Sequence, residues 1–250
     1  MTTESIPLIN FRKNIFSQNG EDGIIEEIIK RLELKELEVC EFGAWDGKHL
    51  SNTFNLVKNF NAKAVYIEGD KKKYQDLLKT AKEYPNILPI NAFVSHKNDK
   101  NCLHNLLSLT FLKKNFDILS IDIDGHDLEV VFRMQNYIPK IIIIEINSSM
   151  MPGIKHMHST KIKGNSFSST IDVLKKKNYT PVLHNKGNLF FINNLHLAKI
   201  NLDNIYIECN EKLFCDFDIL RQRRLAKILQ KFLPGLIFKK LKKLRDFIFY

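Results

Sequence analysis

The 250-residue chain has little cysteine, and none of it is spaced for a metal site or a disulfide framework. Its four cysteines, Cys40, Cys102, Cys209 and Cys215, form no C-x-x-C pair and have no histidine at metal-binding spacing. No apolar run approaches the roughly 20 residues of a membrane span, and nothing at the N-terminus is typical of a signal peptide. We therefore expect neither disulfides nor a zinc site, and a cytoplasmic protein.

The sequence also lacks the two common phosphate-binding glycine patterns, G-x-G-x-x-G and the P-loop with its Lys and Ser/Thr. Instead, Gly43 and Gly47 follow an apolar run at 37–42. A buried strand that ends in such a turn lets backbone approach a ligand closely, and the spacing favours a nucleoside without phosphates. The next predicted strand ends in Glu68, and a carboxylate at this place binds ribose hydroxyls.

Net positive charge is small over most of the chain and is concentrated in its last thirty residues. The formal net charge is +10, and residues 221–250 contain ten basic residues against one acidic residue, so the rest is nearly neutral. A nucleic-acid groove would spread basic residues over the body of the protein. We therefore expect no nucleic-acid partner, one domain at residues 1–215 and a basic tail at 221–250.

The tail has apolar residues at helical spacing from Leu225 to Ile248, with lysine and arginine on the remaining face. This pattern is typical of an amphipathic helix that lies on an anionic membrane. A basic residue close to such a surface contributes ~1 kcal/mol, so the sequence predicts peripheral attachment to the inner face of the cytoplasmic membrane. The alternative is that the stripe packs on the protein's own core or on a second subunit, and the oligomeric state stays open.

Apolar periodicity places helices and strands along the body of the chain. An amphipathic helix is expected at 17–33, with acidic residues in its first turn. Near-continuous apolar runs predict strands at 37–42, 64–70, 87–94, 116–127 and 140–147, and a hairpin at 180–184 and 188–192. Strands this apolar need helices on both faces, so the sheet should be mostly parallel, with ligands at the carboxyl ends.

Five polar residues gather where the fourth and fifth predicted strands end: Asp122, Asp124, His126, Glu145 and Asn147. They would converge if these strands are neighbours or one strand apart. Ionisable groups at the ends of apolar strands are costly without a function. We therefore favour a functional cluster, although one or two of these residues could simply cap helices or turns.

Five segments together resemble the class I S-adenosylmethionine-dependent methyltransferases, and more narrowly the FkbM-like group and its bacterial relatives around surface-glycan and antibiotic-sugar genes. The segments are Ser17 to Gly23, Glu41 to Gly47, Tyr66 to Asp70, Ser120 to Asp127 and Ile144 to Asn147. The resemblance implies a Rossmann-like α/β fold, with a mostly parallel seven-stranded sheet and helices on both faces. It also implies S-adenosylmethionine as the cofactor.

The resemblance further implies which residues bind the cofactor and which carry out the reaction. The cofactor-binding residues would be Gln18, Asp22, Glu41, Gly43, Ala44, Asp46, Gly47, Ser51, Asn52, Glu68, Asn91, Ala92 and Asp122, with Phe93 also near adenine. His126 would be the general base beside Asp124, and a divalent cation, Mg²⁺ or Mn²⁺, would bind Asp124, Glu145 and Asn147. A further acid is expected beside Glu145, where this sequence has Ile146.

Methyl transfer to a hydroxyl needs alignment and removal of the acceptor's proton. A sugar hydroxyl is about as weakly acidic as water, and a cation would lower that pKa, whereas His126 alone could serve a more acidic acceptor. The expected acceptor is a sugar, a nucleotide-linked sugar or another surface-glycan precursor. The long loop from Ser148 to Asn165 is the expected acceptor lid, with His156 and His158 as exposed loop residues rather than ligands.

Two other functions compete with this one. A nicotinamide-dependent oxidoreductase could use a similar doubly wound sheet, but the missing fingerprint glycine and the cluster after the fourth strand disfavour it. A membrane-associated adaptor without catalytic activity would use the same fold and the basic tail. Binding of S-adenosylmethionine, of NAD or of neither separates the three.

Overall fold

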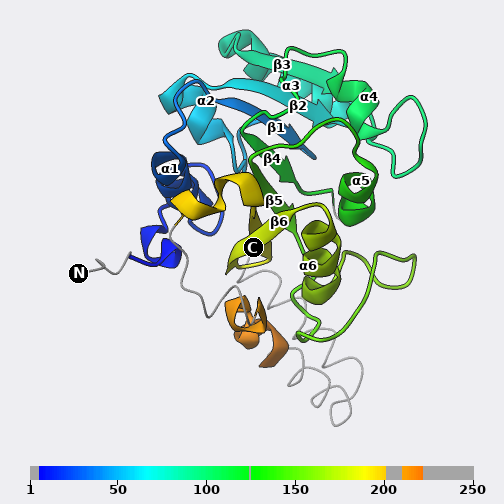
Figure 1. Cartoon of the computed structure of the whole chain (residues 1–250). Coiled ribbons are helices and arrows are strands. Elements are labelled where there is room, and N and C mark those ends of the chain that lie inside the picture. The colour runs from blue at the N-terminus through cyan, green and yellow to red at the C-terminus, as the bar shows by residue number, and fades with distance from the viewer. Residues whose placement is uncertain (1–5, 124, 201–209, 222–250) are drawn as a thin grey trace, which may run out of the picture.

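The structure is a computed structural model of the chain and describes residues 6–123, 125–200 and 210–221 (Figure 1). Asp124, Cys209 and nearly all of the predicted tail lie outside the described residues. Within the described part, no helix is both long and apolar enough to cross a bilayer.

Seven strands form one sheet in the order β3-β2-β1-β4-β5-β7-β6. The strands are β1 (Glu38–Phe42), β2 (Lys63–Glu68), β3 (Ile87–Asn91), β4 (Ile118–Ile121), β5 (Ile141–Glu145), β6 (Tyr179–Asn185) and β7 (Asn188–Asn193). The first five are parallel, and β7 runs antiparallel to both β5 and β6. The predicted mostly parallel sheet with a terminal hairpin is confirmed.

Helices cover both faces of the sheet (Figure 1). One face packs against α1 (Glu21–Leu32), α2 (Phe54–Phe60) and α3 (Lys71–Glu83), and the other against α4 (Leu103–Leu107), α5 (Asp127–Arg133) and α6 (Phe167–Lys176). Alternate residues of β1 divide between the two cores: Val39 faces the α1 side, and Cys40 and Phe42 face the α5 side. The central strands are buried on both faces, which is why they read as continuous apolar runs.

Three short 3₁₀ helices complete the described chain: η1 (Leu8–Phe11), η2 (Asn194–Lys199) and η3 (Asn210–Leu213). The first lies against α1, and the second packs Leu197 onto the core on the α1 side.

The first helix is shorter than the sequence predicts. It begins at Glu21 rather than at residue 17, because Gly20 has a left-handed backbone with φ of 91° and residues 15–17 instead wrap around the Asp22 side chain. A left-handed residue cannot continue a right-handed helix toward its N-terminus. Residues 15–20 are therefore a loop at the carboxyl edge of the sheet.

The strand order reverses at β1, with β2 and β3 on one side of it and β4 and β5 on the other. The segment from β1 to β3 builds the sheet toward one side of β1, and β4 then pairs with the other side. In open α/β sheets, ligands bind beyond the carboxyl ends of the strands at such a switch point. This position contains the ends of β1, β2 and β4, where most of the predicted site residues lie.

Candidate active site

The loop after β1 is fixed by packing at both of its glycines. The amides of Gly43 and Ala44 both donate to the Ile67 carbonyl, at 3.0 and 3.2 Å. A Cβ at Gly43, whose φ is 80°, would collide with the Asp122 backbone carbonyl, and a Cβ at Gly47 would lie 2.7 Å from a methyl of Leu77. Close backbone approach therefore explains both glycines, as the sequence predicts, although the partners seen are β4 and the core.

The carboxylate of Glu68 joins the β1 loop to the end of β2. One of its oxygens accepts the Trp45 amide at 2.8 Å, and the other accepts the Asp70 amide at 2.7 Å. A carboxylate has about four lone-pair sites, so both oxygens can accept further hydrogen bonds. Glu68 is thus held in one orientation at the switch point and can still bind two ribose hydroxyls.

An exposed aromatic ring lies beside Glu68. Phe93 is 74% exposed, and its ring covers Gly69 so closely that any side chain at Gly69 would collide with it. Asn91 and Ala92 fix the same segment: the Asn91 side-chain amide and the Ala92 backbone amide donate to the Glu68 carbonyl at 2.8 and 3.2 Å. The three residues predicted near adenine therefore lie together, and Phe93 offers a face on which a base could stack.

Glu41 is buried one strand away and organises the segment before α2. One oxygen of its carboxylate accepts the Thr53 hydroxyl at 2.7 Å, the Thr53 amide at 3.0 Å and the Ser51 hydroxyl at 3.0 Å. Burial, with a smaller contribution from the nearby Asp122 carboxylate, raises the pKa of Glu41 to about 7. Asn52 donates to the Ser120 hydroxyl at 3.1 Å, so this segment is also tied to β4.

Asp122 differs from Glu41 because it is exposed, directly after the last residue of β4. Its carboxylate lies close enough to contribute to the raised pKa of Glu41.

Asp22 closes the loop that precedes α1. A single carboxylate oxygen accepts the amides of Ile15, Phe16 and Ser17 and the Ser17 hydroxyl, at distances between 2.7 and 2.8 Å. Its other oxygen is buried with no hydrogen-bond partner among the described residues. Gln18 is exposed within the same loop.

Asp46 has a similar local role after β1, since one of its oxygens accepts the amides of Lys48 and His49 at 2.9 and 2.7 Å. The structure therefore shows Asp22 and Asp46 as loop-closing residues, and contact of either with a cofactor stays a prediction.

Three histidine rings from three separate loops pack together at the ends of β3, β4 and β5. His126, at the start of α5, stacks on His96 with ring centroids 3.8 Å apart, and His158 lies 4.4 Å away on a tilted plane. We refer to these three residues as the histidine cluster. The sequence singled out His126 only; it offered no signal for His96, and His158 is half-buried rather than exposed.

Acidic side chains orient the histidine cluster. Glu129, one turn along α5, places a carboxylate oxygen 3.4 Å from Nδ1 of His126. Asp127 is buried, and its two oxygens accept the amides of Ile123 and Gly125 at 2.8 and 2.9 Å, which fixes the turn before His126. Burial, followed by the charge of His126, lowers the pKa of His96.

The loop from 148 to 165 lies against this turn. Its Asn165 is fully buried, accepts the His158 amide at 3.0 Å and donates to the Gly125 carbonyl at 3.3 Å. His158 in turn accepts the Gly164 amide on Nδ1 at 3.1 Å. His156 is also half-buried rather than exposed, with its ring near the Ile162 carbonyl. The loop thus delivers His158 to the site, which sequence spacing alone did not reveal.

The structure describes two of the three predicted cation ligands, Glu145 and Asn147. Asp124 lies outside the described residues, and Glu145 is half-buried at the end of β5. Asn147 uses both ends of its amide within its own loop: the oxygen accepts the Ser149 amide at 3.1 Å, and the nitrogen donates to the Lys163 carbonyl at 2.7 Å. A cation there would have to compete with these bonds, so Asn147 fits a metal poorly.

Within the described ranges, a group of three possible metal ligands occurs elsewhere, at His184, Cys215 and Asp216. Nδ1 of His184 accepts the Cys215 amide at 3.0 Å, and Nε2 lies 3.4 Å from the Asp216 carboxylate. Burial lowers the pKa of His184 to about 4. This group joins β6 to the segment after η3 and contains no residue that the sequence predicted for the site.

Comparisons with known proteins bear on the fold. No family model matches the sequence, and no curated protein matches it. The sheet has seven strands, with β7 antiparallel between β5 and β6. The chain has a Rossmann-like α/β fold of the kind that the class I methyltransferase resemblance implied. The narrower FkbM-like resemblance stays a prediction.

Three similar solved structures can be named. TrmK of M. capricolum, in complex with S-adenosylhomocysteine, has 15% identity and a TM-score of 0.44 over 89% of this chain and 96% of that chain. A SAM-dependent methyltransferase from Aquifex aeolicus has 11% identity and a TM-score of 0.42 over 67% and 86%. The N-terminal domain of EvdMO1 with bound SAH has 12% identity and a TM-score of 0.45 over 71% and 80%. At these values we infer nothing from them about acceptor or mechanism.

Proposed function

We propose that this chain is an S-adenosylmethionine-dependent O-methyltransferase that acts on a small hydroxyl acceptor. One observation carries the proposal: Glu68, fixed beside the exposed Phe93 ring, and His126, fixed in the histidine cluster, lie at the carboxyl ends of strands of the same sheet. The first is suited to a nucleoside and the second to removing a proton. The acceptor we favour is a sugar, a nucleotide-linked sugar or another surface-glycan precursor.

S-Adenosylmethionine would supply a methyl group bound to a positively charged sulfur. The acceptor oxygen would attack the methyl carbon in line, and the sulfur would leave as a neutral thioether. Glu68 would hold the ribose hydroxyls, the Phe93 face would hold the adenine, and the paired carboxylates Glu41 and Asp122 would attract the positive charges. Alignment of reacting groups by such contacts supplies much of the rate enhancement.

His126 would accept the proton that the acceptor hydroxyl loses as its new bond to carbon forms. Glu129 attracts a proton to Nδ1, so Nε2 is the nitrogen left to act as base. Stacking on His96 and contact with His158 restrict rotation of the ring. Glu129 is thus a positioning residue, and a base oriented in this way needs no further group for a moderately acidic hydroxyl.

The proposal includes a divalent cation only if the methyl acceptor is a weakly acidic alcohol. Asp124 and Glu145 would provide hard oxygen ligands of the kind that Mg²⁺ or Mn²⁺ prefers. Assaying turnover in EDTA, with and without added Mg²⁺ or Mn²⁺, tests this. Full activity in the chelator would remove the cation from the proposal and leave the His126 base in place.

Titration calorimetry with S-adenosylmethionine and with NAD tests the function itself. We expect S-adenosylmethionine to bind and NAD not to. Binding of NAD alone would overturn the proposal in favour of an oxidoreductase, and binding of neither would favour a protein without catalytic activity. A mass-spectrometric screen of nucleotide-linked sugars for a gain of one methyl group would then identify the acceptor.

A further inference from the structure

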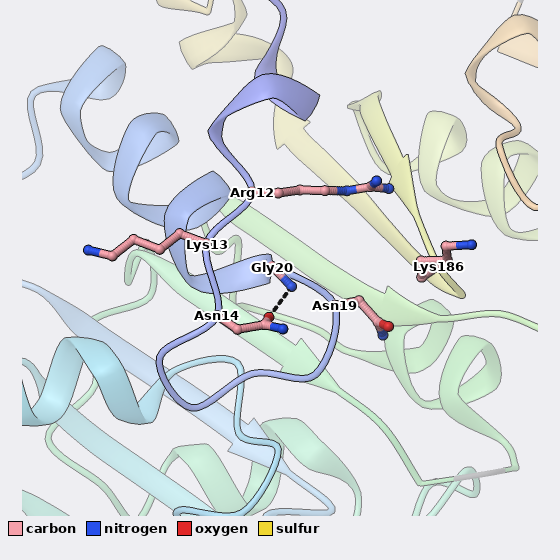
Figure 2. A pocket seen from close by; sticks show the side chains of 6 residues that line it. All are labelled: Arg12, Lys13, Asn14, Asn19, Gly20 and Lys186. Atoms are coloured by element: carbon pink, nitrogen blue, oxygen red, sulfur yellow. Dashed lines mark hydrogen bonds between the residues drawn. The ribbon is translucent and has the colours of Figure 1, made fainter. Parts of the chain in front are cut away.

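A cavity of about 310 Å³ lies between the loop before α1 and the turn of the β6–β7 hairpin (Figure 2). The residues that line it are Arg12, Lys13, Asn14, Asn19, Gly20 and Lys186. Three of these six are cationic and none is acidic. Pockets for small ligands have volumes of ~300–1,000 Å³, so this one is large enough for a group of a few heavy atoms or for part of a larger ligand.

The cavity lies at the same edge of the sheet as the proposed active site. The hairpin turn at Lys186 and Gly187 meets the carboxyl end of β5, because the Ile146 amide donates to the Gly187 carbonyl at 2.7 Å and Asn188 pairs with Glu145. The strand β5 is the neighbour of β4, which leads into the histidine cluster. A ligand in the cavity would therefore lie on the acceptor side of the sheet, beyond β5.

Arg12 is held by a neutral group rather than by a carboxylate. Its Nε donates to the Asn185 side-chain oxygen at 2.6 Å, and Asn185 is fully buried. The Asn185 amide nitrogen donates in turn to the Asn19 carbonyl at 3.1 Å and the Glu21 carboxylate at 3.3 Å. The bond to Asn185 orients the guanidinium without neutralising it. It uses one of five N–H donors, and the two Nη groups are not needed for it.

The loop that forms one wall is closed by its own backbone. The Lys13 amide donates to the Gly20 carbonyl at 3.2 Å, the Gly23 amide donates to the Lys13 carbonyl at 3.1 Å, and the Asn14 side chain accepts the Gly20 amide. A Cβ at Gly20 would lie 2.7 Å from Cβ of Arg12, and one at Gly23 would collide with the Phe11 carbonyl. The wall is therefore built before any ligand arrives.

The charges around the cavity are unbalanced. Among the residues that the structure describes, Arg12, Lys13 and Lys186 form no ion pair with an acidic side chain. The buried Glu21 behind the turn accepts the Asn19 amide and the side-chain amides of Asn185 and Asn188. Figure 2 shows Arg12 extending toward the hairpin that carries Lys186, with Asn19 on the same side, whereas Lys13 points the opposite way.

We propose that this cavity binds a phosphate or diphosphate group of the methyl acceptor through Arg12, Lys186 and the Asn19 side chain. A planar guanidinium matches two phosphate oxygens, and an ammonium adds a second positive charge for a dianion. The inference rests on the proposed function and narrows the acceptor to a phosphorylated one, such as a nucleotide-linked sugar. A neutral sugar would leave both cations without a partner.

Pyrophosphate binding to the full-length chain, measured by titration calorimetry, tests the proposal. Arg12→Gln and Lys186→Gln should each weaken pyrophosphate binding at least tenfold. Lys13→Gln removes the same charge from the same loop but from a side chain that points away, so its effect should be under about twofold. Melting curves of each variant show whether it is folded, and Lys186→Gln, at an exposed turn, should fold normally even if Arg12→Gln does not.

Three outcomes overturn the proposal. No pyrophosphate binding by the wild-type chain would do so, as would equal weakening in Lys13→Gln, which would indicate a general charge effect. Binding to vesicles of phosphatidylglycerol that depends on Arg12 and Lys186, without pyrophosphate binding, would assign the cavity to a lipid headgroup instead. S-Adenosylmethionine binding is measured in parallel: its absence from the wild type would overturn the proposed function, and its retention in Arg12→Gln would separate the two sites.

Discussion

The carboxyl ends of β1 and β2 differ from the end of β4 in how their polar side chains are held. Glu41 and Glu68 are bonded by backbone amides and hydroxyls from their own or adjacent loops. In the histidine cluster, side chains from three loops are held mainly by stacking, and Nδ1 of His126 is buried without a hydrogen bond among the described residues. Nδ1 faces the Glu129 carboxylate at 3.4 Å, so Nε2 is the nitrogen left for the proposed proton transfer.

This difference indicates that the two regions have different tasks. The first is organised before any ligand binds, which suits recognition of one constant cofactor. The second leaves an imidazole nitrogen available, which suits proton transfer. Each of the following predictions tests one side of this contrast.

The largest effect is expected from His126→Ala, which removes the proposed base. We expect methyl transfer to slow by ~10²- to 10⁴-fold, with the dissociation constant of S-adenosylmethionine nearly unchanged. Single-turnover rates together with calorimetry measure both quantities. His156→Ala, in the lid loop and outside the cluster, is the matched control. An equal loss of rate in this variant would show that the effect is not specific to His126.

The next effect concerns stability and comes from the raised pKa of Glu41. Between pH 4.5 and about 7 the folded state retains a proton that the unfolded chain has lost, so stability should fall as the pH rises through this range. At 1.36 kcal/mol per pKa unit the total is about 3 kcal/mol. Glu41→Gln cannot ionise, and its free energy of unfolding should not show this fall.

Urea unfolding of both proteins from pH 4.5 to 8 provides the measurement. His184 contributes with the opposite sign, because its pKa is lowered to about 4 and stability is lost as the pH falls below its ordinary value of 6.5. Both proteins contain His184, so its contribution cancels in the difference between them. If the free energy of unfolding changed with pH in the same way in the wild type and in Glu41→Gln, the Glu41 carboxyl would not be the source of the pH dependence.

Glu68→Ala should weaken S-adenosylmethionine binding by about 2–3 kcal/mol, because it removes charge-assisted hydrogen bonds to ribose. The same change also removes the acceptor for the Trp45 amide, so the comparison with Glu68→Gln is informative. The glutamine retains one acceptor oxygen and should lose less. An unchanged dissociation constant in Glu68→Ala would mean that Glu68 does not bind ribose. The ends of β1 and β2 would then lose their proposed role in cofactor recognition.

The smallest effect on catalysis is expected from removing residues 221–250. Methyl transfer to a soluble acceptor should be largely retained, while co-sedimentation with anionic liposomes, which should weaken with salt, is lost. Liposomes of neutral lipid are the control. If the shortened chain unfolds or changes its oligomeric state, the tail is structural and the membrane prediction fails.

Sequence alone determined the elements and which strand ends carry polar groups. Buried strands require near-continuous apolar runs and the hairpin requires a tight turn, and both are local patterns that can be read along the chain. Glu68 was placed correctly as the last residue of β2, whereas β4 ends at Ile121 rather than at residue 127, and His126 lies at the start of α5. The glycines at 43 and 47 were predicted to let backbone approach a ligand; the structure shows that both are needed for packing within the chain, and the ligand contact stays a prediction.

Only the tertiary structure decided which loops meet. His96 and His158 join His126 because the ends of β3, β4 and β5 share one edge of the sheet, and no local spacing reports contacts between loops so distant in sequence. The bond between Arg12 and Asn185 likewise joins residues 173 positions apart, and it depends on β7 and β6 closing the sheet beside α1. Apolar periodicity reports how each element is buried, whereas strand order and loop packing determine which side chains can react or bind together.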